Sequence, residues 1–368
     1  MDTADKDEWG VIESLLPAGW KAAAREQQAF RRARYTLDPA PLLRLLLFHA
    51  VSDGGLRATV AQARAAGIAA MSAVALLKRL RTSVGWLAWL SAALCRSLRA
   101  APRVPHGLRL RAIDSTTVQG PASQGTDWRI HYALDLTTLN CDWCALTDGR
   151  GAELLERTPM RPGDVLLADR NYLRPVGVRA AVDAGAHVLV RLRWTHSPLR
   201  DVRGRRFFAL AQARELKVGQ VGVWPVRLLV PAGHPIAARV VATKLPAPLA
   251  AQAQRRAARN ARRKGRQPDP RSLQAAQFVM LFTTLPETLL AGADVLELYR
   301  YRWQIELAFK RLKQLLRLGR LPHQDPRAAQ AWILAKLVVA LLLETLYRNA
   351  RSFSPWGYRL PARWSAGP

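Results

Sequence analysis

The stretch Leu108-Arg-Leu-Arg-Ala-Ile-Asp114-Ser-Thr begins the part of the sequence that decides the fold. Leu108, Leu110 and Ala112 alternate with arginines, which is the period of a β-strand with one covered face. Two further runs, at 129–137 and 141–147, are separated by a short polar turn and predict a three-stranded meander. A helix at 152–157, a strand at 165–168, a helix at 176–184 and a strand at 187–192 are predicted next. The order βββαβαβ predicts an α/β fold around a mixed five-stranded sheet.

The remaining segments predict how domains are arranged around this core. The element order is that of a ribonuclease-H-like catalytic core. No alternating run occurs between Asp38 and Leu98, so an all-α N-terminal domain is expected there. Strand-like runs at 206–210, 222–230 and 237–243 predict a β-rich insertion, which a strand at 278–284 closes. The predicted boundaries are 1–100 for the helical domain, 106–193 for the first part of the core, 194–284 for the insertion, 285–350 for the catalytic helix and C-terminal helices, and 351–368 for a tail.

Residues 56–81 in the helical segment read as a helix, a turn at Gly67 and a second helix. That pattern is compatible with a DNA-reading helix-turn-helix, and an ordinary helical hairpin explains it equally well. In the first interpretation the cations of the second helix contact DNA. They are Lys78, Arg79 and Arg81.

The charge of the chain favours a polyanionic partner. Lys and Arg number 56 against 27 Asp and Glu, which gives a formal net charge of +29. Codon bias in an arginine-rich and alanine-rich chain explains part of this excess, but the cations also cluster, which favours nucleic acid. The densest cluster, at 255–266, has no large apolar face and should be exposed, either against a DNA backbone or as a solvated helix or loop. Its candidate DNA contacts are Arg255, Arg256, Arg259, Arg262, Arg263 and Lys264.

Neither a membrane nor a disulfide framework is indicated. The most apolar segment, 331–343, contains Lys336 and is interpreted as a buried helix shorter than a membrane span. The polar segment 1–10 has no secretory pattern, so a cytoplasmic, nucleoid-associated bacterial protein is expected. The single Cys141-x-x-Cys144 has no second Cys or His pair at zinc spacing, so its cysteines are interpreted as small residues that fill a strand.

A helix expected from about Val295 carries one carboxylate among cations. At about 100° per residue, Tyr299, Arg302, Glu306 and Lys313 fall within one narrow stripe, which Lys310 joins. Ile305, Ala308, Phe309 and Leu312 form the opposite, core-facing side. For an arbitrary helix this would be a solvated face.

Two aspartates change that interpretation. Asp114 and Asp169 each end an apolar strand run and share strand parity with its buried residues, so each carboxylate should point to a covered face. A buried carboxylate needs a partner, and a metal ion can serve several at once. Two divalent ions roughly 4 Å apart activate the attacking oxygen and stabilise the leaving oxygen in phosphodiester chemistry. Hard oxygen ligands favour Mg²⁺, with Mn²⁺ as a substitute.

At these residues the chain resembles a family. Tyr299-x2-Arg302-x3-Glu306-x6-Lys313 is similar at every spacing to the Y-R-E-K signature of bacterial DDE-type insertion-sequence transposases. Asp114-Ser-Thr and Asp169-x-x-Tyr172 resemble that family's first and second acidic motifs, and a β-rich insertion before the signature helix also fits. The resemblance spans about 109–313.

The resemblance implies that Asp114, Asp169 and Glu306 bind two Mg²⁺ ions and that Tyr299, Arg302 and Lys313 hold phosphates of the element's end. Water would first nick double-stranded DNA at a terminal inverted repeat, and the freed 3′-OH would then attack the opposite strand or target DNA. Some relatives stack a flipped base on an aromatic before the signature helix, and Phe278 is the nearest one here. Relatives also pair two ends as a homodimer in a synaptic complex.

Three rival interpretations carry other functions. The first is an inactive or domesticated DNA-binding descendant, against which the presence of all three carboxylates argues. The second is a resolvase or integrase with the same core, and the third is a basic nucleoid protein. Neither of the last two explains the signature spacing together with two strand-end aspartates.

Overall fold

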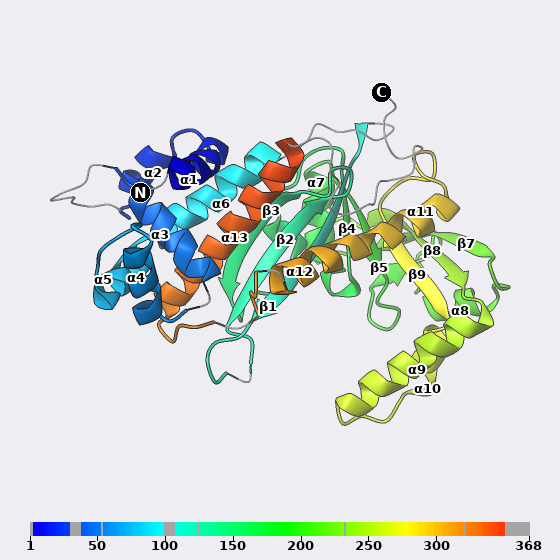
Figure 1. Ribbon diagram of the computed structural model, residues 1–368. Helices are drawn as coiled ribbons and strands as arrows, with labels where there is room; N and C mark the ends of the chain where they lie inside the picture. The colour runs from blue at the N-terminus through cyan, green and yellow to red at the C-terminus, as the bar shows by residue number, and fades with distance from the viewer. Residues whose placement is uncertain are drawn as a thin grey trace. The chain divides into compact units, whose positions relative to one another are not determined.

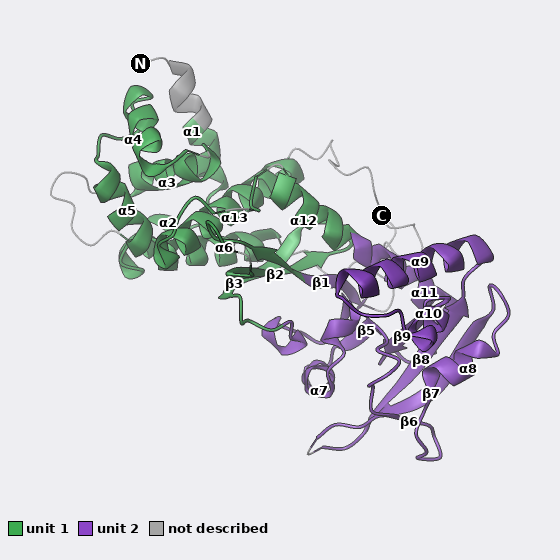
Figure 2. Cartoon of the chain, turned by 90° about the horizontal axis from the view of Figure 1, so that it is seen from below, with its two compact units in different colours: residues 1–101, 115–152, 304–361 green, residues 102–114, 153–303, 362–368 purple. Residues whose placement is uncertain are grey.

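The computed structural model describes residues 3–29, 38–52, 54–98, 107–123, 125–231, 233–314, 316–319 and 321–349. The chain divides into two compact units, shown in Figure 2. Unit 1 comprises residues 1–101, 115–152 and 304–361, and unit 2 comprises 102–114, 153–303 and 362–368. The predicted tail lies outside the described residues. The unit boundaries differ from the predicted domain boundaries, which stay a prediction.

Unit 1 is mainly helical. Its helices are α1 (Thr3–Leu15), α2 (Trp20–Glu26), α3 (Ala40–Val51), α4 (Leu56–Ala65), α5 (Ala73–Thr82), α6 (Val84–Leu98), α12 (Gln304–Gln314) and α13 (Pro326–Asn349). Two strands, β2 (Trp128–Asp135) and β3 (Cys141–Asp148), pair antiparallel in it, and strand β1 (Arg109–Val118) enters it at Ser115.

Helix α13 is the centre of unit 1. It lies along α6 (Figure 1) and also contacts α3, α5 and β3. Trp332 on α13 and Trp86 on α6 are both buried, and the Trp86 ring stacks on Trp20 with 6.1 Å between ring centroids. At 24 residues α13 is long and apolar enough to cross a membrane, so the expectation of a shorter segment was wrong. Most of the helix is buried inside the unit, as in the core of a globular domain.

A buried polar cluster also holds α3 and α4 together. His49 Nδ1 lies 2.8 Å from Thr59 Oγ1, and its Nε2 lies 2.8 Å from His323 Nε2. Burial lowers the pKa of His49 to about 4, with His323 and Lys336 contributing in the same direction. Lys336 itself is buried, donates to the Leu316 carbonyl and lies 4.3 Å from the centroid of the Trp332 ring. His49 is therefore held neutral between an imidazole and a buried cation.

Unit 2 is built on a mixed sheet with the strand order β1-β4-β5-β9-β8-β7-β6. Its other strands are β4 (Asp164–Ala168), β5 (His187–Arg191), β6 (Leu199–Arg200), β7 (Val221–Leu228), β8 (Ile236–Lys244) and β9 (Phe278–Thr283). Its helices and 3₁₀ turns are η2 (Leu155–Arg157), η3 (Arg170–Tyr172), α7 (Pro175–Asp183), α8 (Ala209–Arg214), α9 (Ala247–Arg263), α10 (Pro270–Ala275), α11 (Gly292–Arg300) and η4 (Tyr301–Trp303).

Strand β4 lies in the interior of this sheet. All five of its residues are buried, as expected of a parallel strand covered on both faces. It pairs parallel with β1 on one side and with β5 on the other. Asp164 at its start is 1% exposed and accepts hydrogen bonds from Arg109 at 2.7 and 2.8 Å and from Arg111 at 3.1 Å. This buried ion cluster fixes the start of the β1–β4 ladder, where Arg109 is the register partner of Asp164.

Helix α7 connects β4 to β5, and Gly185 lies two residues after its end. The Ala186 N–H bonds the Ala181 carbonyl and the Gly185 N–H bonds that of Val182, which is the Schellman pattern. Gly185 has φ +70°, and a Cβ there would lie 3.2 Å from Pro162. Glycine is required by both the backbone conformation and the close approach.

The outer part of unit 2 extends the same sheet. Strand β9 pairs antiparallel with β5 and with β8, and β8 pairs with β7 along its length. Helices α9 and α10 lie between β8 and β9 in the chain and project away from these strands in Figure 1. The predicted insertion thus contains three helices as well as strands.

Three predicted elements differ from the structure. The run at 206–210 is not a strand but leads into α8, since a short apolar run does not distinguish the two. The predicted helix at 152–157 is reduced to the single turn η2. The helix expected from Val295 through Lys313 is broken into α11, η4 and α12. A 3₁₀ turn advances about 120° per residue instead of the 100° of an α-helix. The predicted alignment of side chains along one helix face from Tyr299 to Lys313 is therefore interrupted at 301–303.

Candidate active site

Asp114 and Asp169 lie side by side at the ends of two paired strands in unit 2. The parallel ladder ends with Ile113 opposite Ala168, so the next residue on each strand is one of the aspartates. Neighbouring strands lie about 4.8 Å apart. Strand β1 continues past Asp114 to Val118, so Asp114 does not end its strand as predicted but is the first residue beyond the ladder. Both residues are half-buried, which agrees with the covered face predicted for them.

Arg302 supplies a positive charge to this pair. Its Nη1 lies 3.7 Å from Asp114 Oδ2, and the two side chains are 16% and 21% exposed. Two adjacent carboxylates repel each other, and the guanidinium of Arg302 offsets part of this repulsion. The arginine predicted to bind phosphate therefore lies against the first predicted carboxylate.

Tyr299 hydrogen-bonds the backbone immediately before the second aspartate. Its hydroxyl donates to the carbonyl of Ala168 at 3.1 Å, one residue before Asp169. Burial raises the pKa of Tyr299 to about 12, and the charge of Asp169 adds to the rise while Arg302 opposes it. The Arg302 guanidinium lies 5.8 Å from the centroid of the Tyr299 ring. The tyrosine is thus a neutral donor held at the end of β4.

Glu306, Lys310 and Lys313 lie on α12, in unit 1, and all three are exposed. Ile305, Ala308, Phe309 and Leu312 are buried on the same helix, so its predicted division into a core face and a polar face is confirmed. In unit 2, Tyr299 and Arg302 thus lie next to the strand ends that carry the two aspartates. The other two signature residues, Glu306 and Lys313, belong to helix α12 of unit 1.

The donor set of the aspartate pair fits a hard divalent cation. Two adjacent carboxylates offer oxygen ligands, and each is half-exposed, so an ion can reach them. In the described part of unit 2 no sulfur or imidazole group joins them within ligand distance. These features favour Mg²⁺ or Mn²⁺ over zinc.

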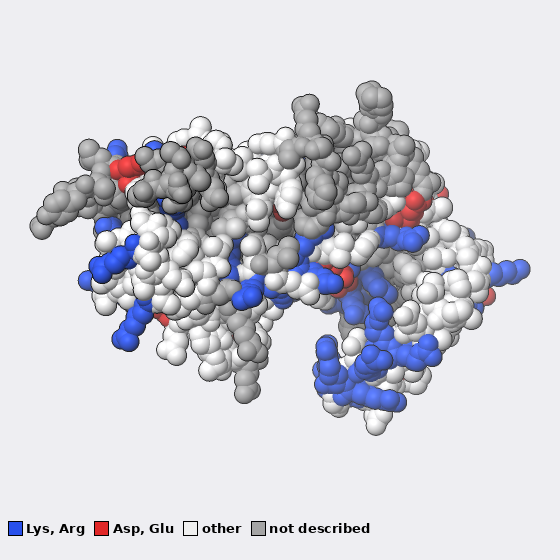
Figure 3. All heavy atoms as spheres, in the orientation of Figure 1, with Lys and Arg blue, Asp and Glu red and all other residues white. Residues whose placement is uncertain are grey.

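A cationic cleft begins beside Asp169. It is lined by Arg170, by Arg191 and by residues of α9 and the following loop that include Arg256, Lys264 and Arg266. Figure 3 shows Lys and Arg gathered over α9. All the cations predicted to be exposed at 255–266 are exposed, so that prediction is confirmed.

Phe278 lines the cationic cleft, but its ring in β9 is 3% exposed, so little of the ring surface can contact a base. Trp194 lines the same cleft and is half-buried, with the Arg271 guanidinium 5.5 Å from its ring centroid. Trp194 was missed because it lies far from the signature helix in sequence and reaches the cleft only through the fold.

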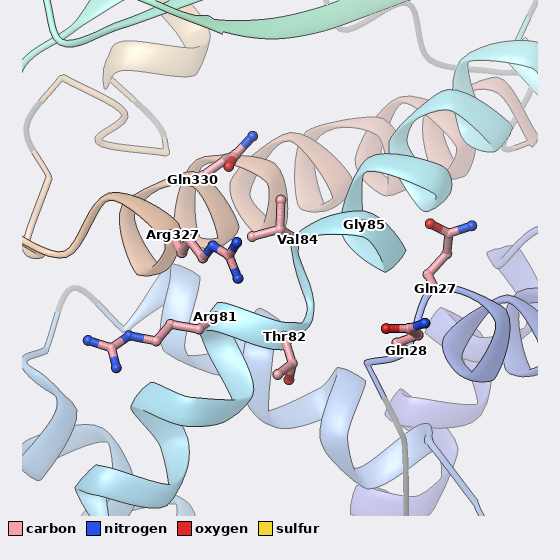
Figure 4. Close-up of a pocket in the computed structure, with 8 residues that line it drawn as sticks. All are labelled: Gln27, Gln28, Arg81, Thr82, Val84, Gly85, Arg327 and Gln330. Carbon is pink, nitrogen blue, oxygen red and sulfur yellow. The ribbon is translucent and has the colours of Figure 1, made fainter.

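The candidate DNA readers of the helical segment lie on α5, at 78–81. Helices α4 and α5 are joined by seven residues, 66–72, which is longer than the turn of three or four residues in a helix-turn-helix. Arg81 pairs with Asp325 at 2.7 Å, while Lys78 is exposed and Arg79 half-buried. Figure 4 shows Arg81 at a pocket between α5, α6 and α13 that Arg327 and Gln330 also line. A DNA-reading role for this segment stays a prediction.

Comparisons with known proteins identify the family of this chain. Residues 105–342 match the family described as Transposase DDE domain. The chain is 35% identical to a putative transposase, InsL, for insertion sequence element IS186A of Escherichia coli K12, over 95% of this chain and 96% of that protein. It is 36% identical to the transposase for insertion sequence element IS421 of Escherichia coli, with the same coverage of each chain. The chain belongs to the family of DDE-domain transposases of insertion sequences.

Proposed function

We propose that this protein binds the ends of its insertion sequence, cuts the DNA there and joins the freed 3′-OH to a second phosphodiester. The observation that carries the proposal is the register of the β1–β4 ladder, which ends immediately before Asp114 on one strand and Asp169 on the other, with Arg302 on Asp114. The strand order β1-β4-β5 with β2 and β3 beyond β1 supports a ribonuclease-H-like core for this chemistry.

Glu306 is proposed as the third carboxylate. It follows Arg302 by four residues, so the chain keeps their Cα atoms within about 14 Å. Arg302 is paired with Asp114, which limits how far Glu306 can lie from the aspartates. Glu306 lies in the first turn of α12 and is exposed, so solvent and ions reach this part of the helix.

Asp114, Asp169 and Glu306 would hold two Mg²⁺ ions, or Mn²⁺ in their place. Such ions, when bound, supply activation of the attacking oxygen and stabilisation of the leaving oxygen. Arg302 offsets the charge of Asp114 and would contact a phosphate oxygen of DNA bound at this site. Tyr299 donates to Ala168 and so orients the backbone that carries Asp169. Lys313 and Lys310, on the exposed face of α12, bind phosphates of the transposon end.

The cationic cleft beside Asp169 is the proposed path of the DNA duplex. Arg170 and the exposed arginines of α9 provide phosphate contacts, which position a duplex without reading its sequence. Trp194 is proposed in place of Phe278 as the ring that a displaced base stacks on. The partners are the terminal inverted repeats and target DNA, with two copies of the chain pairing two ends in the cytoplasm.

Cleavage of DNA carrying the element's ends tests the proposal directly. The purified chain should nick this DNA with Mg²⁺, while Asp114→Ala, Asp169→Ala and Glu306→Gln should each lose cleavage by at least a hundredfold. These variants should still bind the ends, because phosphate contacts supply most of the affinity. Arg302→Ala and Lys313→Ala should weaken end binding itself.

Asp183→Asn is the matched control, since Asp183 is an exposed carboxylate at the end of α7 with a side chain 61% exposed. It should cut at the wild-type rate. Wild-type cleavage by any one of the three carboxylate variants would remove that residue from the site. Specific end binding without any cleavage by the wild-type protein would instead favour a domesticated DNA-binding descendant.

A further inference from the structure

All three cysteines of the chain meet in unit 1. Cys95 lies near the end of α6, and Cys141 and Cys144 lie on β3. The Cys95 Sγ atom is 3.6 Å from that of Cys141 and 3.7 Å from that of Cys144, and all three sulfurs lie within 4.8 Å of one another. Among the described residues, no other group of three His, Cys, Asp or Glu side chains is gathered so closely.

A β-bulge explains why Cys141 and Cys144 face the same side. Residues three apart on a regular strand point to opposite faces. In the β2–β3 ladder Ala133 pairs with Trp143 while Leu134 pairs with Cys141, so Asp142 is an extra residue on β3. One inserted residue reverses the parity and turns both cysteines toward α6, which packs on β3. Bulges commonly re-aim a side chain at a site.

The separations fit a metal-thiolate site. Zn²⁺ binds cysteine sulfur at about 2.3 Å in tetrahedral geometry, which places neighbouring sulfurs about 3.8 Å apart. A disulfide needs about 2.05 Å and would join two of the sulfurs and leave the third. Three sulfurs in mutual proximity instead form one face of a tetrahedron. Hydrogen bonds between thiols allow similar distances, so an experiment must separate a metal from a thiol cluster.

Glu344 lies next to this face and is held there by two hydrogen bonds. Its Oε2 accepts from the Cys141 N–H at 2.7 Å, and its Oε1 accepts from the Tyr132 hydroxyl at 3.0 Å. These bonds hold the bulged strand against α13 and turn the carboxylate inward. Cys144 is half-buried, which leaves a route for an ion and for a fourth ligand such as water.

We propose that Cys95, Cys141 and Cys144 bind one Zn²⁺ ion as thiolates, with Glu344 as a positioning residue and water in the fourth position. The site would tie α6 to β3 and be separate from the carboxylate site. Binding releases up to three protons, because each thiol must be deprotonated to bind: Zn²⁺ and three thiols give a tris-thiolate complex of charge −1 and three H⁺. No oxidant or reductant is needed.

Cobalt substitution tests this site independently of DNA cleavage. The full chain, reduced and freed of metal by a chelator, is titrated with Co²⁺ alone. We expect one equivalent to produce the near-ultraviolet sulfur-to-cobalt charge-transfer band and Zn²⁺ to displace it. Zn²⁺ should also raise the melting temperature of the wild-type protein. Asp114→Ala should keep the band, since carboxylate ligands do not generate it.

Cys95→Ser and Cys144→Ser should lose the band and the Zn²⁺-dependent rise in melting temperature. Cys144→Ser is the milder change because Cys144 is half-buried. Ser91→Ala, one turn earlier on α6 and also buried, is the matched control and should behave as wild type. Circular dichroism confirms that each variant is folded.

Two results would overturn the proposal. One is a wild-type protein whose three thiols react with a thiol reagent after unfolding but which gives no band with excess Co²⁺. The other is an undiminished band in both serine variants. Loss of two thiols on exposure to air, without Co²⁺ binding, would identify a redox pair instead. All three outcomes leave the proposed transposase chemistry untouched.

Discussion

Replacing Asp164 by asparagine should strongly destabilise the protein. Asp164 Oδ1 and Oδ2 accept from Arg109 at 2.7 and 2.8 Å, and Oδ2 also accepts from Arg111 and from the Arg161 N–H, both at 3.1 Å. Asp164→Asn keeps the shape but removes the charge, so two buried guanidinium groups lose the carboxylate that pairs with both of them. Removing one partner of a buried ion pair costs about 3–5 kcal/mol, a large part of the 5–15 kcal/mol that stabilises a typical domain.

The assay is urea unfolding followed by circular dichroism. The midpoint should fall by the equivalent of at least 3 kcal/mol, whereas Asp183→Asn, which removes the carboxylate of an exposed i,i+4 pair, should cost less than about 0.5 kcal/mol. Because burial of unpaired charge is the cause, a variant that replaces Arg109, Arg111 and Asp164 together by Met, Met and Leu should be more stable than Asp164→Asn. A loss below 1 kcal/mol for Asp164→Asn, or a triple variant less stable than it, would refute this reasoning.

Three further changes test other parts of the structure. His49 has a folded pKa of about 4, below its ordinary 6.5, so the unfolded chain binds the proton first and stability falls as pH drops from 6.5 to 4. This amounts to about 2 kcal/mol at pH 5, and His49→Gln should flatten that slope in urea titrations across pH. Tyr299→Phe removes one hydrogen bond and should lower the unfolding free energy by about 1 kcal/mol, and an unchanged urea midpoint would contradict the bond. Replacing Arg255, Arg256 and Arg259 by alanine should lower the slope of log K against log salt by about 0.9 per lost phosphate contact, and equal slopes for mutant and wild-type protein would exclude α9 from the DNA path.

The sequence predicted the strands of the catalytic core well because their patterning is local. Alternation at 109–113 and a continuous apolar run at 165–168 identify β1 and β4 without knowledge of the fold. The breaks near the signature helix were not predictable in the same way. Tyr299, Arg302 and Glu306 fit one helical period, and the change of hydrogen bonding at 301–303 occurs where the chain passes from one compact unit to the other.

Contacts between residues far apart in the chain could not be predicted from local sequence patterns. A zinc motif that is recognisable in sequence has a second nearby pair of ligands, but here the third sulfur comes from Cys95, 46 residues before Cys141 and on a helix. The bulge at Asp142 that turns both strand cysteines to one side has no signature in the residue types. The burial of Phe278 and the place of Trp194 in the cleft likewise depend on how β9 and the preceding loop are packed.

The sequence by itself determined the family signature, the exposed cations of 255–266 and the two aspartates that follow apolar strand residues. These follow from spacing, charge and period, which are properties of neighbouring residues. Only the tertiary structure decided that Asp114 and Asp169 are adjacent and that Arg302 contacts Asp114. It also decided that the sulfurs of the three cysteines lie within 4.8 Å of one another. Strand register and helix packing join residues far apart in the chain, and they are fixed by burial and buried ion pairs such as that of Asp164, which no local pattern encodes.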